Sequence, residues 1–141
     1  MLSARTLPSR YFTPQEANEL IPTIRAFLLK IHEHTRTLLR IERELDALGP
    51  VPAREALLIQ REERERGQTH LLERIEALGA ELVDPLELGR VRFPAMRNGE
   101  PVWLLWNLGE AKVESWTPMG GQLFGPRPLA GTVPVRWEWR N

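Results

Sequence analysis

The first half of the chain repeats apolar residues with a helical period. From residue 17 to residue 48 they recur at spacings of three and four, as in the seam of a helical hairpin. The seam comprises Ala17, Leu20, Ile24, Phe27, Ile31, Leu38, Ile41, Leu45 and Leu48, with His34 as its one polar member. Thr13-Pro14-Gln15-Glu16 is a capping box with proline at the first helical position, so a helix is predicted to begin here. Pro22 is expected to bend this helix without ending it.

A second helix is predicted after a short turn. Gly49-Pro50-Val51-Pro52 should end the first helix and start another over residues 53–78, before Gly79. So short a connection favours antiparallel neighbours, in which the numbers of facing residues add up to about 101. This register places His34 opposite Gly67 and Gln68. We therefore expect a polar layer there, with a histidine–glutamine hydrogen bond, rather than a metal site.

Beyond Gly79 the apolar residues alternate, and glycine and proline become frequent. Alternation predicts strands over residues 82–83, 91–93, 102–106, 111–116 and 133–139, with turns at Asp84-Pro85 and Asn98-Gly99 and a loop over 118–128. All five tryptophans follow residue 100. The predicted fold class is α+β: one domain over residues 1–141, with a long antiparallel helical hairpin (13–79) followed by a small, tryptophan-rich antiparallel β-sheet (80–141).

Two blocks of sequence resemble a bacterial and archaeal family of uncharacterised proteins, the domain of unknown function DUF2203. The first block runs from Tyr11 to Pro22, and the second comprises Phe93-Pro94-Ala95, Gly99, Val102, Leu104, Trp106, Gly109-Glu110 and Trp116. The resemblance implies a shared architecture and no known reaction. The family pattern has an acid, a cysteine, a histidine and a Gly-Arg pair at positions that here hold Arg92, Leu105, Thr117 and Gly125-Pro126. The chain therefore resembles a divergent member that lacks most of the family's polar chemistry.

Composition narrows the functional classes. Nineteen basic and nineteen acidic residues give zero net charge, which provides no general attraction to the phosphates of duplex nucleic acid. The chain has no cysteine, which excludes disulfides and thiolate sites and favours the cytoplasm. No apolar run approaches the length of a membrane span, so no membrane partner is expected. Cofactor and metal motifs are absent from the sequence, and neither kind of ligand is predicted.

The tryptophan-rich segment carries the candidate site. Its members are a set of aromatic, acidic and basic residues that could line a small-molecule pocket: Arg97, Trp106, Glu110, Trp116 and Arg127. Glu110 and Glu114 flank Lys112, but strand alternation would put all three on one solvated face, so catalytic residues are not predicted. Tryptophan and arginine together could also stack on single-stranded bases.

The expected function is a non-enzymatic interaction or oligomerisation module. Four residues widen the apolar stripe of the first helix beyond what one partner helix can cover: Ile21, Leu28, Leu29 and Leu39. A homodimer would cover them, and an unknown protein partner is a further possibility. Two alternatives stay open: single-strand nucleic-acid binding through the sheet, and a small-molecule enzyme or sensor with a pocket of Trp106, Glu110 and Arg127.

Overall fold

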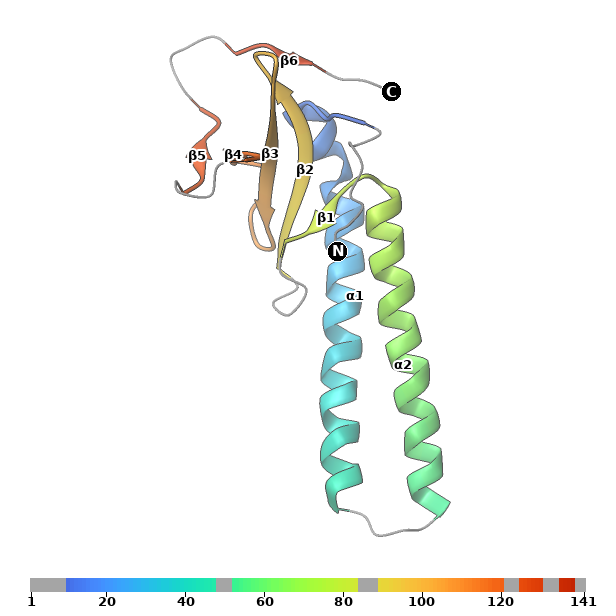
Figure 1. Ribbon diagram of the computed structural model, residues 1–141. Helices are drawn as coiled ribbons and strands as arrows, with labels where there is room; N and C mark the ends of the chain where they lie inside the picture. The colour runs from blue at the N-terminus through green and yellow to red at the C-terminus, as the bar shows by residue number, and fades with distance from the viewer. Residues whose placement is uncertain (1–9, 48–51, 84–88, 121–124, 131–134, 139–141) are drawn as a thin grey trace.

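The computed structural model describes residues 10–47, 52–83, 89–120, 125–130 and 135–138. Two long helices, α1 (Pro14–Ala47) and α2 (Pro52–Ala77), lie side by side and antiparallel (Figure 1). An antiparallel sheet follows, with strands β1 (Glu81–Leu82), β2 (Arg90–Arg97), β3 (Glu100–Asn107), β4 (Ser115–Pro118), β5 (Arg127–Pro128) and β6 (Trp137–Glu138). The predicted α+β fold class, a helical hairpin followed by a sheet, is confirmed.

The capping box starts α1 as predicted. The Thr13 amide donates to Oε1 of Glu16 over 2.9 Å, and the Glu16 amide donates to Oγ1 of Thr13 over 3.1 Å. Two amides that the helix itself cannot satisfy are thereby bonded. The helix then continues through Pro22 to Ala47. The predicted turn at residues 49–52 lies outside the described residues except for Pro52, the first residue of α2.

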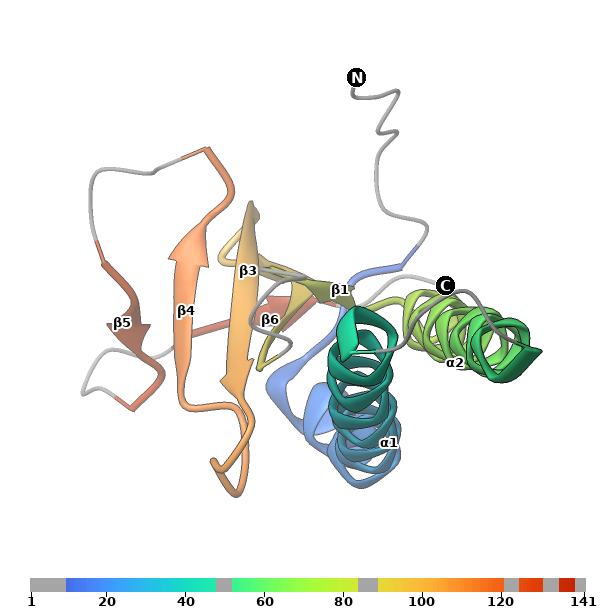
Figure 2. The same cartoon turned by 90° about the horizontal axis from the view of Figure 1, so that it is seen from below.

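One hydrophobic core joins the helices to the sheet, and α1 lies between α2 and the sheet (Figures 1 and 2). The first half of α1 contributes Ala17, Ile21, Ile24, Leu28 and Ile31 to this core, and α2 contributes Ile75. One face of β2 and β3 contributes cross-strand pairs: Val91 with Trp106, Phe93 with Leu104, and Ala95 with Val102. Each large apolar side chain buried here stabilises the fold by roughly 1.5–3 kcal/mol.

The sheet covers only the first half of α1, and the rest of the hairpin projects beyond it (Figure 1). Ile21 and Leu28 are fully buried in the core shared with the sheet, so the expectation that a second copy covers them is wrong. Sequence periodicity shows how wide an apolar stripe is and cannot tell which element covers it. Leu29 and Leu39, the other two members of the widened stripe, are 53% and 58% exposed.

Three separate segments complete the outer edge of β2, opposite β3. β1 pairs with one end of β2, β6 pairs with the other end, and between them the Phe12 amide donates to the Pro94 carbonyl over 2.8 Å. The nitrogen and carbonyl of one strand residue point to the same side. Pro94, which has no amide hydrogen, therefore faces this edge and removes no hydrogen bond from the β2–β3 pairing.

The Asn98-Gly99 turn joins β2 to β3 as predicted. Asn98 has a φ of 51° and Gly99 a φ of 84°, the two positive values that a type I′ hairpin turn requires. Asn98 also binds Arg136 twice: its amide donates to the Arg136 carbonyl over 2.9 Å, and its Oδ1 accepts from the Arg136 amide over 2.8 Å. The turn residue thus holds the chain that leads into β6 against the end of β2.

Two predicted strands differ from those observed. The strand expected over residues 111–116 begins only at Ser115, because the Val113 amide donates to Oδ1 of Asn18 in α1 over 2.7 Å instead of joining the sheet. Of the strand expected over residues 133–139, the described part that pairs is Trp137–Glu138. Residues 133, 134 and 139, like the Asp84-Pro85 turn, lie outside the described residues.

Gly79, just after α2, should tolerate alanine poorly. Its φ is 102°, and a Cβ there would lie 2.8 Å from the ring of Phe12. Gly109 is a matched control, since its φ is 108° and a Cβ there would meet nothing within 4 Å. We expect Gly109→Ala to lower the free energy of unfolding by about 1 kcal/mol and Gly79→Ala by about 1–3 kcal/mol more, measured by urea unfolding. Equal losses would contradict close packing of Phe12 on Gly79.

Candidate functional site

The five predicted site residues fall into two groups. Trp106, Trp116, Arg97 and Arg127 lie on the face of the sheet that carries the core, as the pairings of Leu104 with Trp116 and of Trp116 with Arg127 require. Glu110 lies in the turn after β3. Trp106 contacts Glu110 in one group, and Arg97, Trp116 and Arg127 form the other.

The first group fastens α1 to the end of β3. Trp106 is fully buried, and its indole Nε1 donates to the Glu110 carbonyl over 2.9 Å. Nη2 of Arg25, from α1, donates to the same carbonyl over 3.4 Å, and its guanidinium carbon lies 5.8 Å from the centroid of the Trp106 ring. A buried indole with its N–H satisfied is a packing element, and its ring faces are not open to a ligand.

The Glu110 carboxylate closes the turn between β3 and β4. Its Oε1 accepts from the Asn107 amide over 2.8 Å, while the Glu110 amide donates to the Asn107 carbonyl over 2.9 Å. All three residues precede β4, so the expectation that Glu110, Lys112 and Glu114 share one strand face is wrong. The carboxylate stabilises the turn, since a backbone amide left without an acceptor would lower the free energy of unfolding.

The second group places two guanidinium groups against one indole. The guanidinium carbons of Arg97 and Arg127 lie 4.2 Å and 5.3 Å from the centroid of the Trp116 ring. Trp116 is 7% exposed, Arg97 is half-buried and Arg127 is exposed. Cations at these distances are attracted to the negative face of the ring. The group therefore presents positive charge at the surface above an almost buried aromatic ring.

The opposite face of the sheet carries a fourth arginine–tryptophan contact, between Arg92 and Trp103, which the sequence did not predict. The guanidinium carbon of Arg92 lies 3.9 Å from the centroid of the Trp103 ring, and Nε and Nη2 donate to Oε1 of Glu81 over 3.1 Å and 2.8 Å. Arg92 and Leu105 are direct cross-strand partners, and Thr117 pairs with Trp103. The departures from the family pattern at residues 92, 105 and 117 thus lie together on this face.

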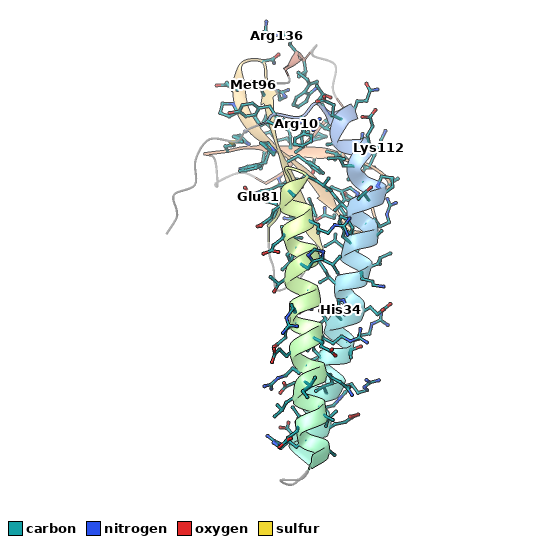
Figure 3. The ribbon with its side chains drawn as sticks, turned by 90° about the vertical axis from the view of Figure 1, so that its right-hand side faces the viewer. Arg10, His34, Glu81, Met96, Lys112 and Arg136 are labelled. Atoms are coloured by element: carbon teal, nitrogen blue, oxygen red, sulfur yellow. The ribbon has the colours of Figure 1, made fainter. Side chains whose placement is uncertain are left out.

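The predicted polar layer lies midway along the hairpin, beyond the sheet (Figure 3). The register is confirmed, because a Cβ on Gly67 would lie 2.9 Å from Nε2 of His34. The predicted hydrogen bond to Gln68 is wrong: Arg64 lies 3.0 Å from Nδ1 of His34, and Gln68 donates to Oγ1 of Thr35 over 2.6 Å. The arginine side chain is long enough to reach the imidazole from one turn away along α2.

The contact with Arg64 favours the neutral form of the His34 imidazole. Because a guanidinium has only donors, Nδ1 of His34 accepts, as in the neutral ring. Burial and the positive charges of Arg64 and Lys30 lower the pKa of His34 below its usual 6.5, and Glu33 opposes them. The folded protein therefore favours the neutral imidazole of His34. The stability that comes from this lowered pKa is fully present above pH 6.5 and is lost as the pH falls through the lowered pKa.

We expect acidification from neutral pH to destabilise the wild type more than His34→Leu, since leucine binds no proton. At neutral pH the same substitution should stabilise the hairpin by about 1 kcal/mol, as an apolar residue completes the seam. Thermal melts across this pH range measure both effects. His70→Leu, at an exposed position of α2, is the control for titration elsewhere. Equal acid sensitivity in the wild type and His34→Leu would contradict the assignment.

Comparison with known proteins identifies a family and no characterised relative. The model of a family described as "Uncharacterized conserved protein (DUF2203)" matches residues 10–123. No curated protein and no solved structure matches. Within the described ranges, no three histidine or acidic side chains are grouped so that they could hold a metal ion. None of the described helices has an apolar stretch long enough to span a bilayer.

Proposed function

We propose that this chain, which belongs to the uncharacterised DUF2203 family, is a non-enzymatic module that associates with a second copy through the part of the hairpin beyond the sheet. One observation carries the proposal: mostly beyond the sheet, the outward faces of α1 and α2 bear opposite charge, and each includes one exposed apolar side chain, Leu29 and Ile59. In a homodimer the basic face of one copy meets the acidic face of the other. Because the two faces of one copy point in opposite directions, one face on each copy stays free to add further copies.

The outward face of α1 is basic. The α1 stripe consists of exposed residues at alternating spacings of four and three: Leu29, Glu33, Arg36, Arg40 and Arg43. Arg36 and Arg43 lie two residues before Leu38 and Leu45, which puts them almost opposite the seam that meets α2. Within one chain, the stripe therefore points away from α2. Three arginines and one glutamate give these five residues a net positive charge, and the exposed Glu44, which pairs with Arg40, borders them.

The outward face of α2 is acidic. The α2 stripe consists of the exposed residues Glu55, Ile59, Glu62, Glu63 and Arg66. Ile59 and Glu62 lie two residues before Arg61 and Arg64, which reach across the hairpin to Glu42 and His34. The α2 stripe therefore points away from α1. Three glutamates and one arginine give it a net negative charge.

Opposite charge on two outward stripes favours contact between copies. An α1 stripe against the α2 stripe of another copy would place arginines near glutamates, while Leu29 and Ile59, 53% and 62% exposed, would be removed from water. Zero net charge means that no overall repulsion opposes this contact. The sheet flanks only the first half of α1 and leaves the stripe accessible (Figure 1).

The candidate site supports a non-enzymatic role. The Glu110 carboxylate is hydrogen-bonded to the backbone of its own turn. On the outer face of the sheet, two positions where the family pattern has an acid and a cysteine hold Arg92, which is ion-paired, and Leu105, which is buried. Stacking of nucleic-acid bases is less favoured, because Trp106 and Trp116 are almost completely buried and Arg92 lies over Trp103. The cysteine-free sequence supports a cytoplasmic location.

Two charge-reversal variants test the proposal by light scattering over a range of concentrations. The wild type should be at least dimeric at micromolar concentration. Arg40→Glu/Arg43→Glu makes both stripes acidic, and Glu55→Arg/Glu62→Arg makes both basic, so each variant alone should be monomeric. An equimolar mixture should associate again, because an acidic α2 stripe then meets a basic α1 stripe.

Thermal melts of the separate variants control for folding, since exposed ion pairs such as Arg40 with Glu44 contribute little to stability. Leu39→Ser, at an exposed position of α1 outside the stripe, is the control for loss of apolar surface. A wild type that stays monomeric at every concentration would overturn the proposal. So would a mixture of folded variants that fails to associate.

A further inference from the structure

The two faces of the sheet carry arginine–tryptophan contacts that differ in one respect. On the outer face, the Arg92 guanidinium stacks on Trp103 and donates two hydrogen bonds to the Glu81 carboxylate. The chain thus supplies both the aromatic surface and the anion. A stacked guanidinium keeps its N–H groups directed outward in its own plane, where they match the two oxygens of an oxyanion.

On the face that carries the core, Trp116 supplies the aromatic surface for Arg97, but among the described residues no carboxylate plays the part that Glu81 plays for Arg92. The guanidinium carbon of Arg97 lies 4.2 Å from the Trp116 centroid, yet across the described ranges no carboxylate forms an ion pair with it. Glu100 is its cross-strand partner and is exposed. Arg127, which has a further contact within the chain, adds a second guanidinium 5.3 Å from the same centroid. The separation of the two guanidinium carbons is therefore at most the sum of these two distances.

We propose that Arg97 and Arg127 form a binding site for the oxyanion group, carboxylate or phosphate, of a small acidic molecule. The oxyanion accepts two hydrogen bonds from the outward edge of the Arg97 guanidinium, as Glu81 accepts from Arg92. Arg127 supplies further positive charge from β5, the strand next to that of Trp116. Both arginines lie over the ring of Trp116, which is too buried for a ligand to stack on it. The inference is independent of the proposed self-association, because the site lies on the sheet and the stripes lie on the hairpin.

The location of the site suits an exchangeable ligand. Arg97 ends β2 next to the type I′ turn, and Arg127 lies on β5, at the edge of the sheet. Arg97 is half-buried and Arg127 exposed, so an anion would lose part of its hydration and keep a path to solvent. Partial removal from water strengthens a charged hydrogen bond relative to one at a fully exposed arginine.

Titrations followed by NMR of the tryptophan indole N–H groups test the site. Inorganic phosphate, citrate and a short oligothymidylate are added separately at constant ionic strength, with chloride as the reference anion. The Trp116 signal is assigned by its loss in Trp116→Phe. We expect it to shift saturably with phosphate or citrate, and comparison of the two affinities distinguishes a phosphate ligand from a carboxylate. The signal of Trp106, which is fully buried, should not move.

Arg97→Gln should weaken binding by roughly tenfold or more, the loss expected when a charged hydrogen-bonded partner is removed. Arg92→Gln is the matched control: it removes an arginine that stacks on tryptophan but already has a carboxylate, and binding should be unchanged. Equal losses in the two variants would overturn the proposal, as would a wild-type Trp116 signal that does not saturate with either small anion. Binding of the oligothymidylate alone would overturn it in favour of a nucleic-acid surface.

Discussion

The first half of α1 has to bury two faces at once, and most of the architecture depends on this constraint. One face meets the sheet through residues such as Ile21 and Leu28, while the seam meets α2. Arg25 and Asn18 add polar bonds from α1 to the chain between β3 and β4. Beyond the sheet only the seam between the helices must be buried. The second half of the hairpin therefore consists of the two helices alone, and leucine and isoleucine side chains on it are exposed.

The parts of the fold that the sequence predicted are those fixed by local chemistry. The capping box, the Asn98-Gly99 turn and the alternation in β2 and β3 each require only neighbouring residues. Features that depend on distant partners were missed. Asn18, 95 positions from Val113, delays the start of the strand expected over 111–116, and only the sheet shows that Ile21 and Leu28 need no second copy.

The sequence named five candidate site residues but did not give their grouping in space. Strand parity put Trp106 and Trp103 on opposite faces, as observed, because it depends only on position in the strand. It could not separate Trp106 and Glu110 from the Trp116 group, since that separation depends on how the turn at Glu110 closes. In the hairpin, likewise, the helical register placed His34 opposite Gly67. It could not show that the long side chain of Arg64 contacts the His34 imidazole.

Arginine outnumbers lysine seventeen to two, and the structure gives the guanidinium specific roles. Arginines lie over Phe12, Phe27, Trp103, Trp106 and Trp116. A planar, weakly hydrated cation can cover an aromatic ring and still bind an oxyanion at its edge, which a lysine ammonium cannot do in the same way. Similar contacts can therefore serve packing on one face of the sheet and recognition on the other.

The composite outer edge of β2 has a consequence for how the protein folds. The helical hairpin and the β2–β3 hairpin join neighbouring segments, so their loops close at small entropic cost. The pairing of Phe12 with Pro94 and that of β6 with β2 join segments far apart in the sequence. Their long sequence separation leads us to expect that they form after the two hairpins, and a chain without them has the outer edge of β2 open to pairing with other chains. Docking of the N-terminal segment beside Pro94 therefore closes an edge that would otherwise be available to another chain.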